Sequence, residues 1–300
     1  MTQRGASGPT HTDLISSREN RWLKLFRARL RGTGPAEREP IGVEGRKLVE
    51  EALRSGLEAE ALLLAESAEP ELEPILRAAS ASEAGIPRSR ILRTTDKLFA
   101  SVAGTEAPQG VAALFRAPAW GFDDVLRGAA NSEGALSSDS TLVVVMAGVQ
   151  DPGNVGTIIR SAEAFGATGA IAARGTADPW SPKALRASAG SALRLPLLRG
   201  IAIPILLAQL KMAGVGIFAA IGRDASSLPS ASKVADENPD LRQRAAIFIG
   251  SEGAGLPHEV VHSADGTLSI PMRSAVDSLN AGIAASILLF DAARQRKSGP

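Results

Sequence analysis

Residue types that commonly carry out chemistry are scarce in this chain. Its 300 residues include no cysteine and no tyrosine, and its histidines are His11, His258 and His262. The lack of cysteine excludes disulfide scaffolds, cysteine-based zinc sites and thiolate nucleophiles, and with them methylation of pyrimidine C5 through a cysteine adduct. Conventional general bases are therefore few, and any reaction must depend on other groups.

The first candidate residues, Asn154 and Arg160, follow the apolar run 142–147. Apolar residues between 155 and 165 fall on one stripe at 100° per residue, which predicts a helix over 154–165 with Arg160 roughly opposite that stripe. A single arginine on an exposed helix face is usually a solvated charge. Arg160 therefore becomes a candidate anion-binding residue only in combination with the other motifs.

Two further segments follow apolar runs. The segment 250–255 combines three glycines, which let a backbone approach a ligand closely, with the carboxylate of Glu252. Ser278 and Asn280 stand at the start of a helical segment rich in alanine and glycine. Taken alone, the first segment also fits a plain turn, and either Ser278 or Asn280 also fits a helix N-cap.

Common catalytic and nucleotide-binding signatures are missing. The chain has no G-x-G-x-x-G after a predicted strand and no G-x-x-x-x-G-K-[ST], so an ordinary Rossmann or P-loop site is unsupported. Ser278 could be paired with His258 and an acid, but it lacks the G-x-S-x-G elbow of serine hydrolases. We therefore set a serine hydrolase aside.

Predicted strands and helices alternate regularly from residue 141 onward. The strands are 142–147, one near 170, 216–221, 245–249 and 268–270, and the helices are 154–165, 182–191, 204–213 and 279–296. This alternation predicts an α/β domain with a mostly parallel sheet covered by helices on both faces. Ligands of such sheets bind beyond the carboxyl ends of the strands, where the three motif segments lie.

The first part of the chain predicts a separate, smaller α/β domain. Residues 18–117 alternate helices (18–31, 44–55, 71–84) with strands (61–65, 91–94, 110–115), and residues 118–140 are rich in glycine, serine, asparagine and aspartate. We therefore divide the chain into a basic arm and helix (1–37), a small domain (38–117), a linker with one short helix (118–140) and a C-terminal domain (141–300).

Charge and hydropathy limit the partners. The net charge of +1 gives no overall attraction for a polyanion, but residues 1–31 hold seven Lys/Arg against two acids. This arm fits either a contact with RNA phosphates or a solubilising tail. No apolar run reaches 18 residues and the first residues lack an apolar signal core, which predicts a cytoplasmic protein without a membrane partner.

The three motifs are weak evidence singly, but their combination is specific. Asn154-x-Gly156-x-x-x-Arg160, then 250–256 (GSEGAGL), then Ile270-Pro-Met272 with Ser278-Leu279-Asn280, occur in this order and each after a strand. The set resembles the motifs of SpoU-type RNA 2′-O-ribose methyltransferases of the SPOUT superfamily. The segments 44–52 (EGRKLVEEA) and 105–111 (TEAPQGV) resemble the L30e-like substrate-binding domain that many of these enzymes carry.

This resemblance implies a fold, a donor and partners. It implies a C-terminal parallel sheet with a deep trefoil knot, S-adenosylmethionine bound inside the knot, and a homodimer with its active site at the subunit interface. No metal is expected. The substrate would be structured RNA, with ribosomal RNA favoured over transfer RNA because the accessory domain resembles a ribosomal protein fold.

The resemblance also assigns site residues. Backbone around Ala220, Ile221, Gly222, Gly250, Ile270, Met272 and Leu279 would hold the methyl donor. Arg160 would lie at the ribose hydroxyl, where a guanidinium, which does not normally deprotonate, acts better as a phosphate clamp and charge stabiliser than as a base. Asn154, Glu252, Ser278 and Asn280 would hold the arginine, the ribose or the donor.

Three alternatives stay open from the sequence. The enzyme could act on transfer RNA, or the scaffold could serve a non-catalytic RNA-binding or ribosome-assembly protein, which would bind no methyl donor. An unrelated small-molecule enzyme of the doubly wound class would show no affinity for RNA.

Overall fold

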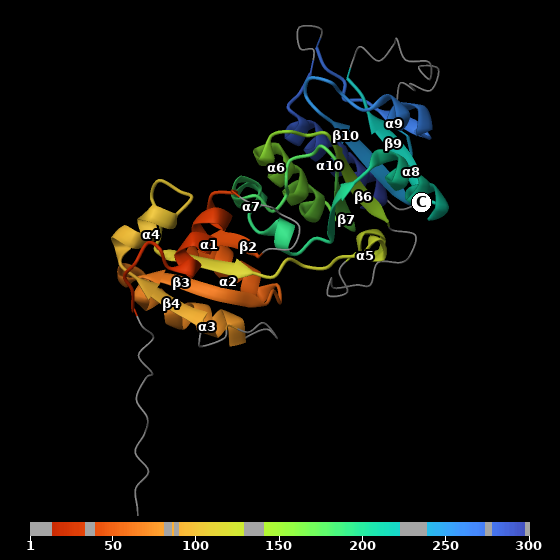
Figure 1. Cartoon of the computed structure of the whole chain (residues 1–300). Helices are drawn as coiled ribbons and strands as arrows, with labels where there is room; N and C mark the ends of the chain where they lie inside the picture. The colour runs from red at the N-terminus through yellow and green to blue at the C-terminus, as the bar shows by residue number, and fades with distance from the viewer. Residues whose placement is uncertain are drawn as a thin grey trace, which may run out of the picture. The chain divides into compact units, whose positions relative to one another are not determined.

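The protein forms two compact units in a computed structural model, Met1–Pro118 (unit 1) and Ala119–Pro300 (unit 2), shown in Figure 1. The structure describes residues 14–33, 40–80, 86, 90–128, 141–222, 239–273 and 278–297. His11, the first part of the basic arm and residues 129–140 of the expected linker lie outside these ranges.

Unit 1 is built on a mixed sheet of five strands. Their order is β1 (Leu14–Ile15), β4 (Ile91–Thr94), β3 (Ala59–Ala65), β5 (Val111–Phe115) and β2 (Ile41–Glu44). The first three strands are parallel, and β5 runs antiparallel to both of its neighbours. The predicted strands are present; β1 and β2 are additions, each too short to show a clear period.

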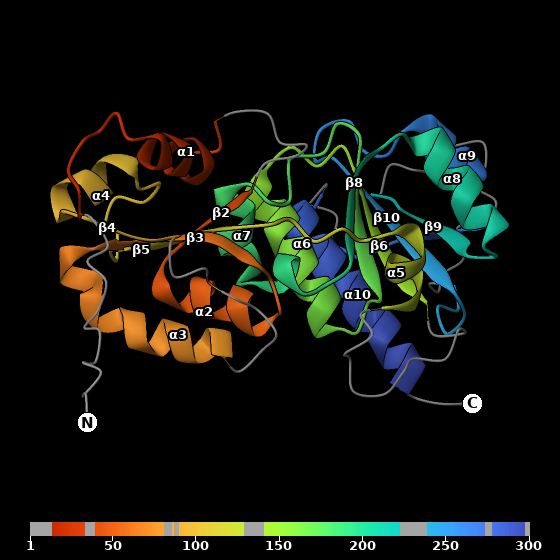
Figure 2. The same cartoon turned by 60° about the horizontal axis from the view of Figure 1, so that its bottom comes forward.

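Helices cover both faces of this sheet (Figure 2). One face carries α1 (Arg21–Leu30) and α4 (Asp96–Val102), and the other carries α2 (Arg46–Arg54) and α3 (Leu72–Ser80), which follows the short helix η1 (Glu66–Glu71). Leu23, Phe26 and Leu30 are buried, at a spacing of three and four residues that places them on one face of the helix. Asn20 Oδ1 accepts a hydrogen bond from the Trp22 N–H at 2.8 Å, so α1 begins three residues later than predicted.

Unit 2 is built on a fully parallel sheet of six strands. Their order is β11 (Gly266–Leu268), β9 (Gly216–Ala220), β10 (Ala245–Gly250), β6 (Leu142–Ala147), β7 (Gly169–Ala173) and β8 (Leu197–Ile201). The α/β class with a parallel sheet is therefore confirmed. Sequence reasoning missed β8, where Arg199 and Gly200 interrupt the apolar run.

Six helices described in unit 2 lie on the two faces of this sheet (Figure 2). One face carries α6 (Pro152–Ala164), α7 (Pro182–Ser188) and α10 (Ala281–Lys297), and the other carries α5 (Phe122–Arg127), α8 (Ile203–Met212) and α9 (His258–Ser263). The helix predicted to reach 191 ends at Ser188, because Ala189 and Gly190 have left-handed backbone conformations before the short helix η4 (Ser191–Leu193).

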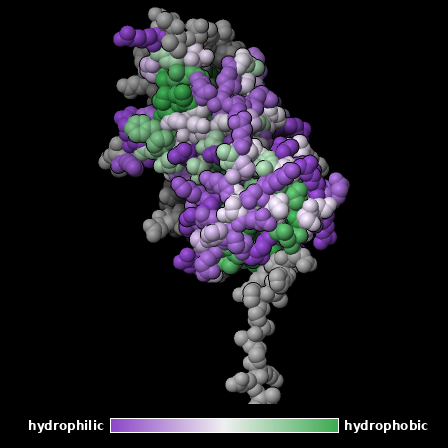
Figure 3. Space-filling view, turned by 90° about the vertical axis from the view of Figure 1, so that its left-hand side faces the viewer, coloured by the Kyte–Doolittle hydropathy of each residue, from purple (hydrophilic) through white to green (hydrophobic). Residues whose placement is uncertain are grey.

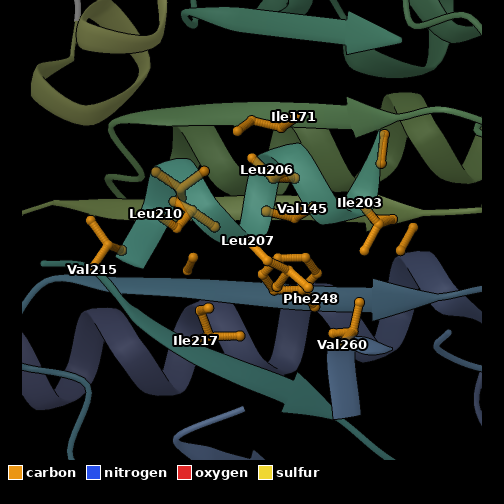
Figure 4. Close-up of a cluster of buried hydrophobic side chains, with 14 of the residues drawn as sticks. Val145, Ile171, Ile203, Leu206, Leu207, Leu210, Val215, Ile217, Phe248 and Val260 are labelled. Atoms are coloured by element: carbon orange, nitrogen blue, oxygen red, sulfur yellow. The ribbon is translucent and has the colours of Figure 1, made fainter. Parts of the chain in front are cut away.

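Buried aliphatic and aromatic side chains fill the face beneath α5, α8 and α9. In Figure 4, Leu206, Leu207 and Leu210 of α8 point toward Val145 and Phe248 of the central strands. The central strands are buried on both faces of the sheet, which explains why their sequences are continuous apolar runs.

Part of the expected linker belongs to this core. Val125 and Leu126 of α5 are buried in it, and the Thr141 hydroxyl donates to the carbonyl of Leu126 at 3.0 Å. Residues 119–128 are therefore an integral element of unit 2 rather than a spacer.

Two close helix contacts fix the helices that carry the motifs. A Cβ atom at Gly156 would lie 2.3 Å from the carbonyl oxygen of Ala184, so only glycine permits α6 to pack this closely on α7. Ser161 and Ser286 join α6 to α10 by a hydrogen bond of 2.7 Å between their hydroxyls. None of the helices in the described ranges combines the length and the apolarity needed to cross a bilayer.

Candidate active site

A cavity of about 490 Å³ lies at the carboxyl ends of β9, β10 and β11. The loops after these strands and the first half of α10 surround it. The lining residues are Ala220, Ile221, Gly222, Ile249, Gly250, Ser251, Glu252, Gly253, Ala254, Gly255, Leu256, Val261, Leu268, Ile270, Met272, Ser278, Leu279, Ala281, Ala284 and Leu288. This location is the one that the parallel-sheet rule predicts.

A chain of hydrogen bonds runs along the rim of this cavity. The backbone N–H groups of Gly282 and Ile283 donate to Asn280 Oδ1 at 3.0 and 3.3 Å. Asn280 Nδ2 donates to Asn154 Oδ1 at 2.9 Å, and Asn154 Nδ2 donates to a carboxylate oxygen of Glu252. Three residues from three separate motifs therefore meet directly.

The direction of this chain follows from the chemistry of its two ends. N–H groups at the start of α10 can only donate, and the Glu252 carboxylate accepts, so both asparagine amides have one orientation. The positive end of the α10 dipole favours negative charge. The series of hydrogen bonds links this helix end to the Glu252 carboxylate. Asn280 is thus the N-cap of α10, as the sequence allowed, and a member of the site as well.

Asp151 positions Asn154. Asp151 caps α6, accepting from the N–H of Gly153 at 3.2 Å, and it pairs with Lys183 at the start of α7. The hydrogen bond from Lys183, then that from the Gly153 N–H, lowers the pKa of Asp151, so the cap stays charged. Asn154 consequently sits in the first turn of α6, buried and aimed at the rim.

The loop that carries Glu252 is closed tightly on itself. Ser251 N–H donates to the Gly255 carbonyl at 3.1 Å, and Gly255 N–H donates back at 3.0 Å. A Cβ atom at Gly250 would lie 2.4 Å from the carbonyl carbon of Gly255, and Gly255 has a φ of +67°. The glycines are therefore required for the loop's own closure as well as for access of a ligand.

The structure brings together most of the predicted site residues. The predicted donor-binding residues line the cavity, together with Glu252 and Ser278; they are Ala220, Ile221, Gly222, Gly250, Ile270, Met272 and Leu279. Arg160 does not line it: this side chain is exposed on α6, and within the described ranges no hydrogen bond or ion pair engages it.

Sequence reasoning missed part of the lining. Ala281, Ala284 and Leu288 of α10 contribute one helical face, and Val261 and Leu268 add two further apolar side chains. Residues 281, 284 and 288 are three and four positions apart, a spacing that indicates a shared helix face. The first half of α10 is rich in small apolar residues, so this face does not stand out against a polar one.

The lining fits S-adenosylmethionine. Ile249, Leu268 and Ile270 offer apolar contact to a base, and glycine-rich backbone offers polar groups at close range. The volume is within the range of cofactor pockets. Among the described residues, no three His, Asp or Glu side chains gather in a way that could hold a metal ion.

Comparisons with known proteins point to one family. The family model described as the SpoU rRNA Methylase family matches residues 141–290, and the model described as RNA 2′-O ribose methyltransferase substrate binding matches residues 43–120. The second range begins after α1.

Individual relatives match nearly the whole chain. RlmP of Bacillus subtilis (strain 168), named as a 23S rRNA (guanosine(2553)-2′-O)-methyltransferase, is 31% identical over 252 residues, covering 83% of this chain and 86% of RlmP. A Mycobacterium tuberculosis (strain H37Rv) protein named as an uncharacterized tRNA/rRNA methyltransferase is 32% identical over 277 residues, covering 90% of this chain and 80% of that protein.

Solved structures agree. An AdoMet-bound rRNA methyltransferase from Sinorhizobium meliloti has a TM-score of 0.71 and 26% identity, covering 94% of this chain and 97% of that one. The SpoU methyltransferase AviRb from Streptomyces viridochromogenes in complex with AdoMet has a TM-score of 0.71 and 25% identity, covering 93% and 100%. The sequence-based resemblance is thus confirmed, and the chain belongs to the SpoU family of RNA 2′-O-ribose methyltransferases, with the family's substrate-binding domain ahead of its methyltransferase domain.

Proposed function

We propose that this chain is a cytoplasmic enzyme that methylates a ribose 2′-hydroxyl of ribosomal RNA with S-adenosylmethionine as donor. The observation that carries the proposal is the hydrogen-bonded chain Asn280–Asn154–Glu252 on the rim of a cavity that fits the donor. The name of RlmP, a 23S rRNA methyltransferase, supports a ribosomal substrate.

The cavity residues would hold the donor. Backbone groups of Gly222, Gly250 and Leu279 bind its polar parts, and the aliphatic side chains of the lining contact its base. When bound, S-adenosylmethionine supplies an electrophilic methyl group. Glu252 places a carboxylate at the edge of this space, where it attracts the positive charge of the donor. The resemblance extends the proposal to a trefoil knot formed by the last third of the chain.

Methyl transfer to an alcohol requires the hydroxyl to be oriented and its developing negative charge to be stabilised. Asn154 and Asn280 hold each other and Glu252 rigidly, which gives the substrate side a fixed geometry. Arg160 clamps the neighbouring phosphate and stabilises the alkoxide; the proton leaves through phosphate or water. A planar guanidinium suits this role because it binds phosphate in a bidentate manner.

The position of Arg160 outside the cavity of its own subunit supports a homodimer. On α10, Ile283, Ile287 and Phe290 are spaced four and three residues apart and remain 52%, 40% and 54% exposed. Figure 3 shows that hydrophobic areas are few on an otherwise largely hydrophilic face. The exposed stripe of Ile283, Ile287 and Phe290 lies on a helix that packs against α6, and a stripe of this kind is typical of an interface between copies of a protein. In this dimer, Arg160 of one subunit serves the cavity of the other.

The experiment is methylation of purified ribosomal RNA and transfer RNA with radiolabelled donor, followed by alkaline hydrolysis. A 2′-O-methylated ribose cannot attack its own phosphate, so a labelled dinucleotide resistant to alkali is expected from ribosomal RNA. Label in transfer RNA alone would move the substrate to that class. Label only in alkali-sensitive mononucleotides would exclude ribose methylation. Binding of RNA without any binding of the donor would indicate a non-catalytic RNA-binding protein.

A further inference from the structure

Two arginines lie close to the ring of Trp22 on the surface of unit 1. The guanidinium carbon of Arg21 is 5.4 Å from the centre of the Trp22 ring, and that of Arg90 is 6.0 Å from it. Arg21 and Trp22 open α1, whereas Arg90 directly precedes β4. Arg90 is held in place by a hydrogen bond of 3.2 Å from Nη1 to the carbonyl of Glu60. We call Trp22, Arg21 and Arg90 the Trp22 cluster.

The cluster is part of a basic surface. Residues 18–31 contain six Arg/Lys and a single acid, Glu19, which pairs with Lys24. The Arg31 guanidinium donates hydrogen bonds to the backbone carbonyls of Ser101 and Ala103. Within the part of the chain that the structure describes, no carboxylate pairs with Arg21 or Arg90, so their charge is available to an external anion.

Packing alone does not account for this arrangement. Leu23 and Phe26 on the same helix are fully buried, whereas the Trp22 indole is only half-buried and Arg21 and Arg90 are exposed. An indole flanked by guanidiniums presents flat π surfaces next to positive charge. Bases stack on such planes, and phosphates pair with the cations. The ligand that fits is an unpaired nucleotide within an RNA chain, because a duplex hides the faces of its bases.

We propose that the Trp22 cluster binds an unpaired nucleotide of the RNA substrate, stacking its base on the indole and the adjacent guanidiniums and pairing its phosphates with Arg21 and Arg90. This contact gives unit 1 a preference for a substrate with a single-stranded loop or bulge. The inference rests on the proposed function for the identity of the polymer. It adds a recognition site formed by the start of α1, which precedes the residues that the substrate-binding family model matches, and by Arg90, which lies within them.

Binding of RNA to the full chain by fluorescence anisotropy, without donor, tests this inference. The probes are a fluorescein-labelled oligouridylate of about 12 nucleotides, a length suited to single-strand binders, and a labelled duplex of about 16 base pairs, the span of a duplex-binding domain. Trp22→Leu keeps an apolar side chain for packing but removes the π surface; it is expected to weaken binding of the oligouridylate about tenfold and to leave duplex binding unchanged. Trp22→Phe should recover most of the affinity.

The charges are tested by salt dependence. Arg21→Gln and Arg90→Gln should each lower the slope of log affinity against log salt by about 0.7 for the single strand. Arg77→Gln is the matched control, because Arg77 is an exposed cation on α3, on the opposite face of the same sheet, and it should leave the slope unchanged. Thermal melting establishes that each variant is folded.

The outcomes separate the two proposals. Wild-type affinity of a folded Trp22→Leu variant, equal losses on both probes, or an Arg77→Gln effect as large as that of Arg21→Gln would overturn the inference. If the enzyme methylates ribosomal RNA in these cases, the proposed function stands and only the stacking site fails. If the wild type does not methylate any RNA yet the Trp22 cluster binds the oligonucleotide as expected, the inference stands as an RNA-binding site alone.

Discussion

Asn280 Nδ2 donates to Asn154 Oδ1 at 2.9 Å although the two residues are 126 positions apart in the chain. This bond joins the first turn of α6 to the start of α10, and Asn154 passes the connection on to Glu252. Each asparagine uses its amide group as both donor and acceptor. Aspartate, which has the same shape and lacks the donor, is therefore the substitution that disturbs the site with the least change in packing.

Asn154→Asp places a second carboxylate against Glu252. Two adjacent carboxylates cannot both ionise easily, so one pKa of the pair rises above its ordinary value. We expect methylation to fall by at least about tenfold at pH 8, as for loss of a preorganised hydrogen bond, and to recover partly at lower pH, where the pair shares a proton. The pH profile of single-turnover methylation measures this.

Glu252→Gln in the Asn154→Asp background is the control. It removes one carboxylate and should abolish the recovery at acidic pH. An Asn154→Asp enzyme with a wild-type pH profile would show that the Asn154–Glu252 hydrogen bond has no part in the reaction.

Arg160→Ala removes the proposed phosphate clamp. The loss expected is about 3 kcal/mol of transition-state stabilisation, roughly a hundredfold in rate. The dissociation constant of the donor, measured by calorimetry, should be unchanged, because Arg160 does not line the donor cavity.

Arg160→Lys separates two roles of the side chain. It keeps the charge but loses the planar fork. A rate as low as that of Arg160→Ala supports a bidentate clamp, whereas near-normal activity supports a point charge or a base. A large loss of donor affinity in either variant would contradict the placement of Arg160 on the RNA side.

Mixing two inactive variants tests whether the site is shared between subunits. Arg160→Ala keeps an intact cavity, and Gly250→Trp keeps Arg160 but brings a bulky side chain into the Gly255 backbone. If Arg160 acts across the dimer, heterodimers refolded from the two variants contain one complete site and regain activity. Each variant refolded alone is the baseline. Mixtures that stay inactive while forming heterodimers would place Arg160 within its own subunit.

The boundary of the catalytic unit is tested by truncation. Residues 119–300 include α5, whose Val125 and Leu126 are in the core, and residues 141–300 do not. The longer fragment should bind S-adenosylmethionine like the full chain. The shorter one should melt at a lower temperature, since removing two buried apolar side chains costs about 2–5 kcal/mol each. Equal melting temperatures for the two fragments would show that α5 is dispensable.

Arg296 should be important for stability. Its guanidinium, largely removed from solvent, donates to the carbonyls of Leu241, Thr141 and Gln243 at 2.8, 2.9 and 2.6 Å, and burial lowers its pKa. Arg296→Ala leaves those carbonyls without this donor and should cost about 3 kcal/mol. Chemical denaturation measures the change. Arg294→Ala, on the same helix but at an exposed side chain paired with the half-buried Asp291, should cost less than about 1 kcal/mol; equal losses would assign no special role to Arg296.

The central strands β6, β7 and β10 of unit 2 were predictable because they are buried on both sides and their sequences are apolar runs, with β6 over 142–147 as the clearest case. β8 was not, because it is partly exposed and contains Arg199 and Gly200. α7 ends where Ala189 adopts a left-handed conformation. Alanine rarely adopts this conformation, so its presence in the sequence did not predict a helix end.

The sequence predicted which residues belong to the site but not which of them are hydrogen-bonded to each other. Asn154, Glu252 and Asn280 were marked by their motifs, but which of them bond to each other depends on how β10, α6 and α10 are arranged in space. The role of Gly250 was only partly foreseen, because its nearest neighbour is the backbone of its own loop rather than a ligand. A short helix was predicted within the linker, but its burial in the core of unit 2 was not, because a helix of about a turn and a half carries little periodicity.

Gly156 lies between Asn154 and Arg160 in α6, and a Cβ atom at this position would lie 2.3 Å from the carbonyl oxygen of Ala184 in α7. A larger residue there would push α6 away from α7 and move Asn154 and Arg160 together with the helix. The hydrogen-bonded Asn154 and the exposed Arg160 therefore cannot be repositioned independently by changes at this helix crossing. A mutation in α7 that changes the distance between the two helices therefore moves the exposed face of α6 and the rim of the cavity together.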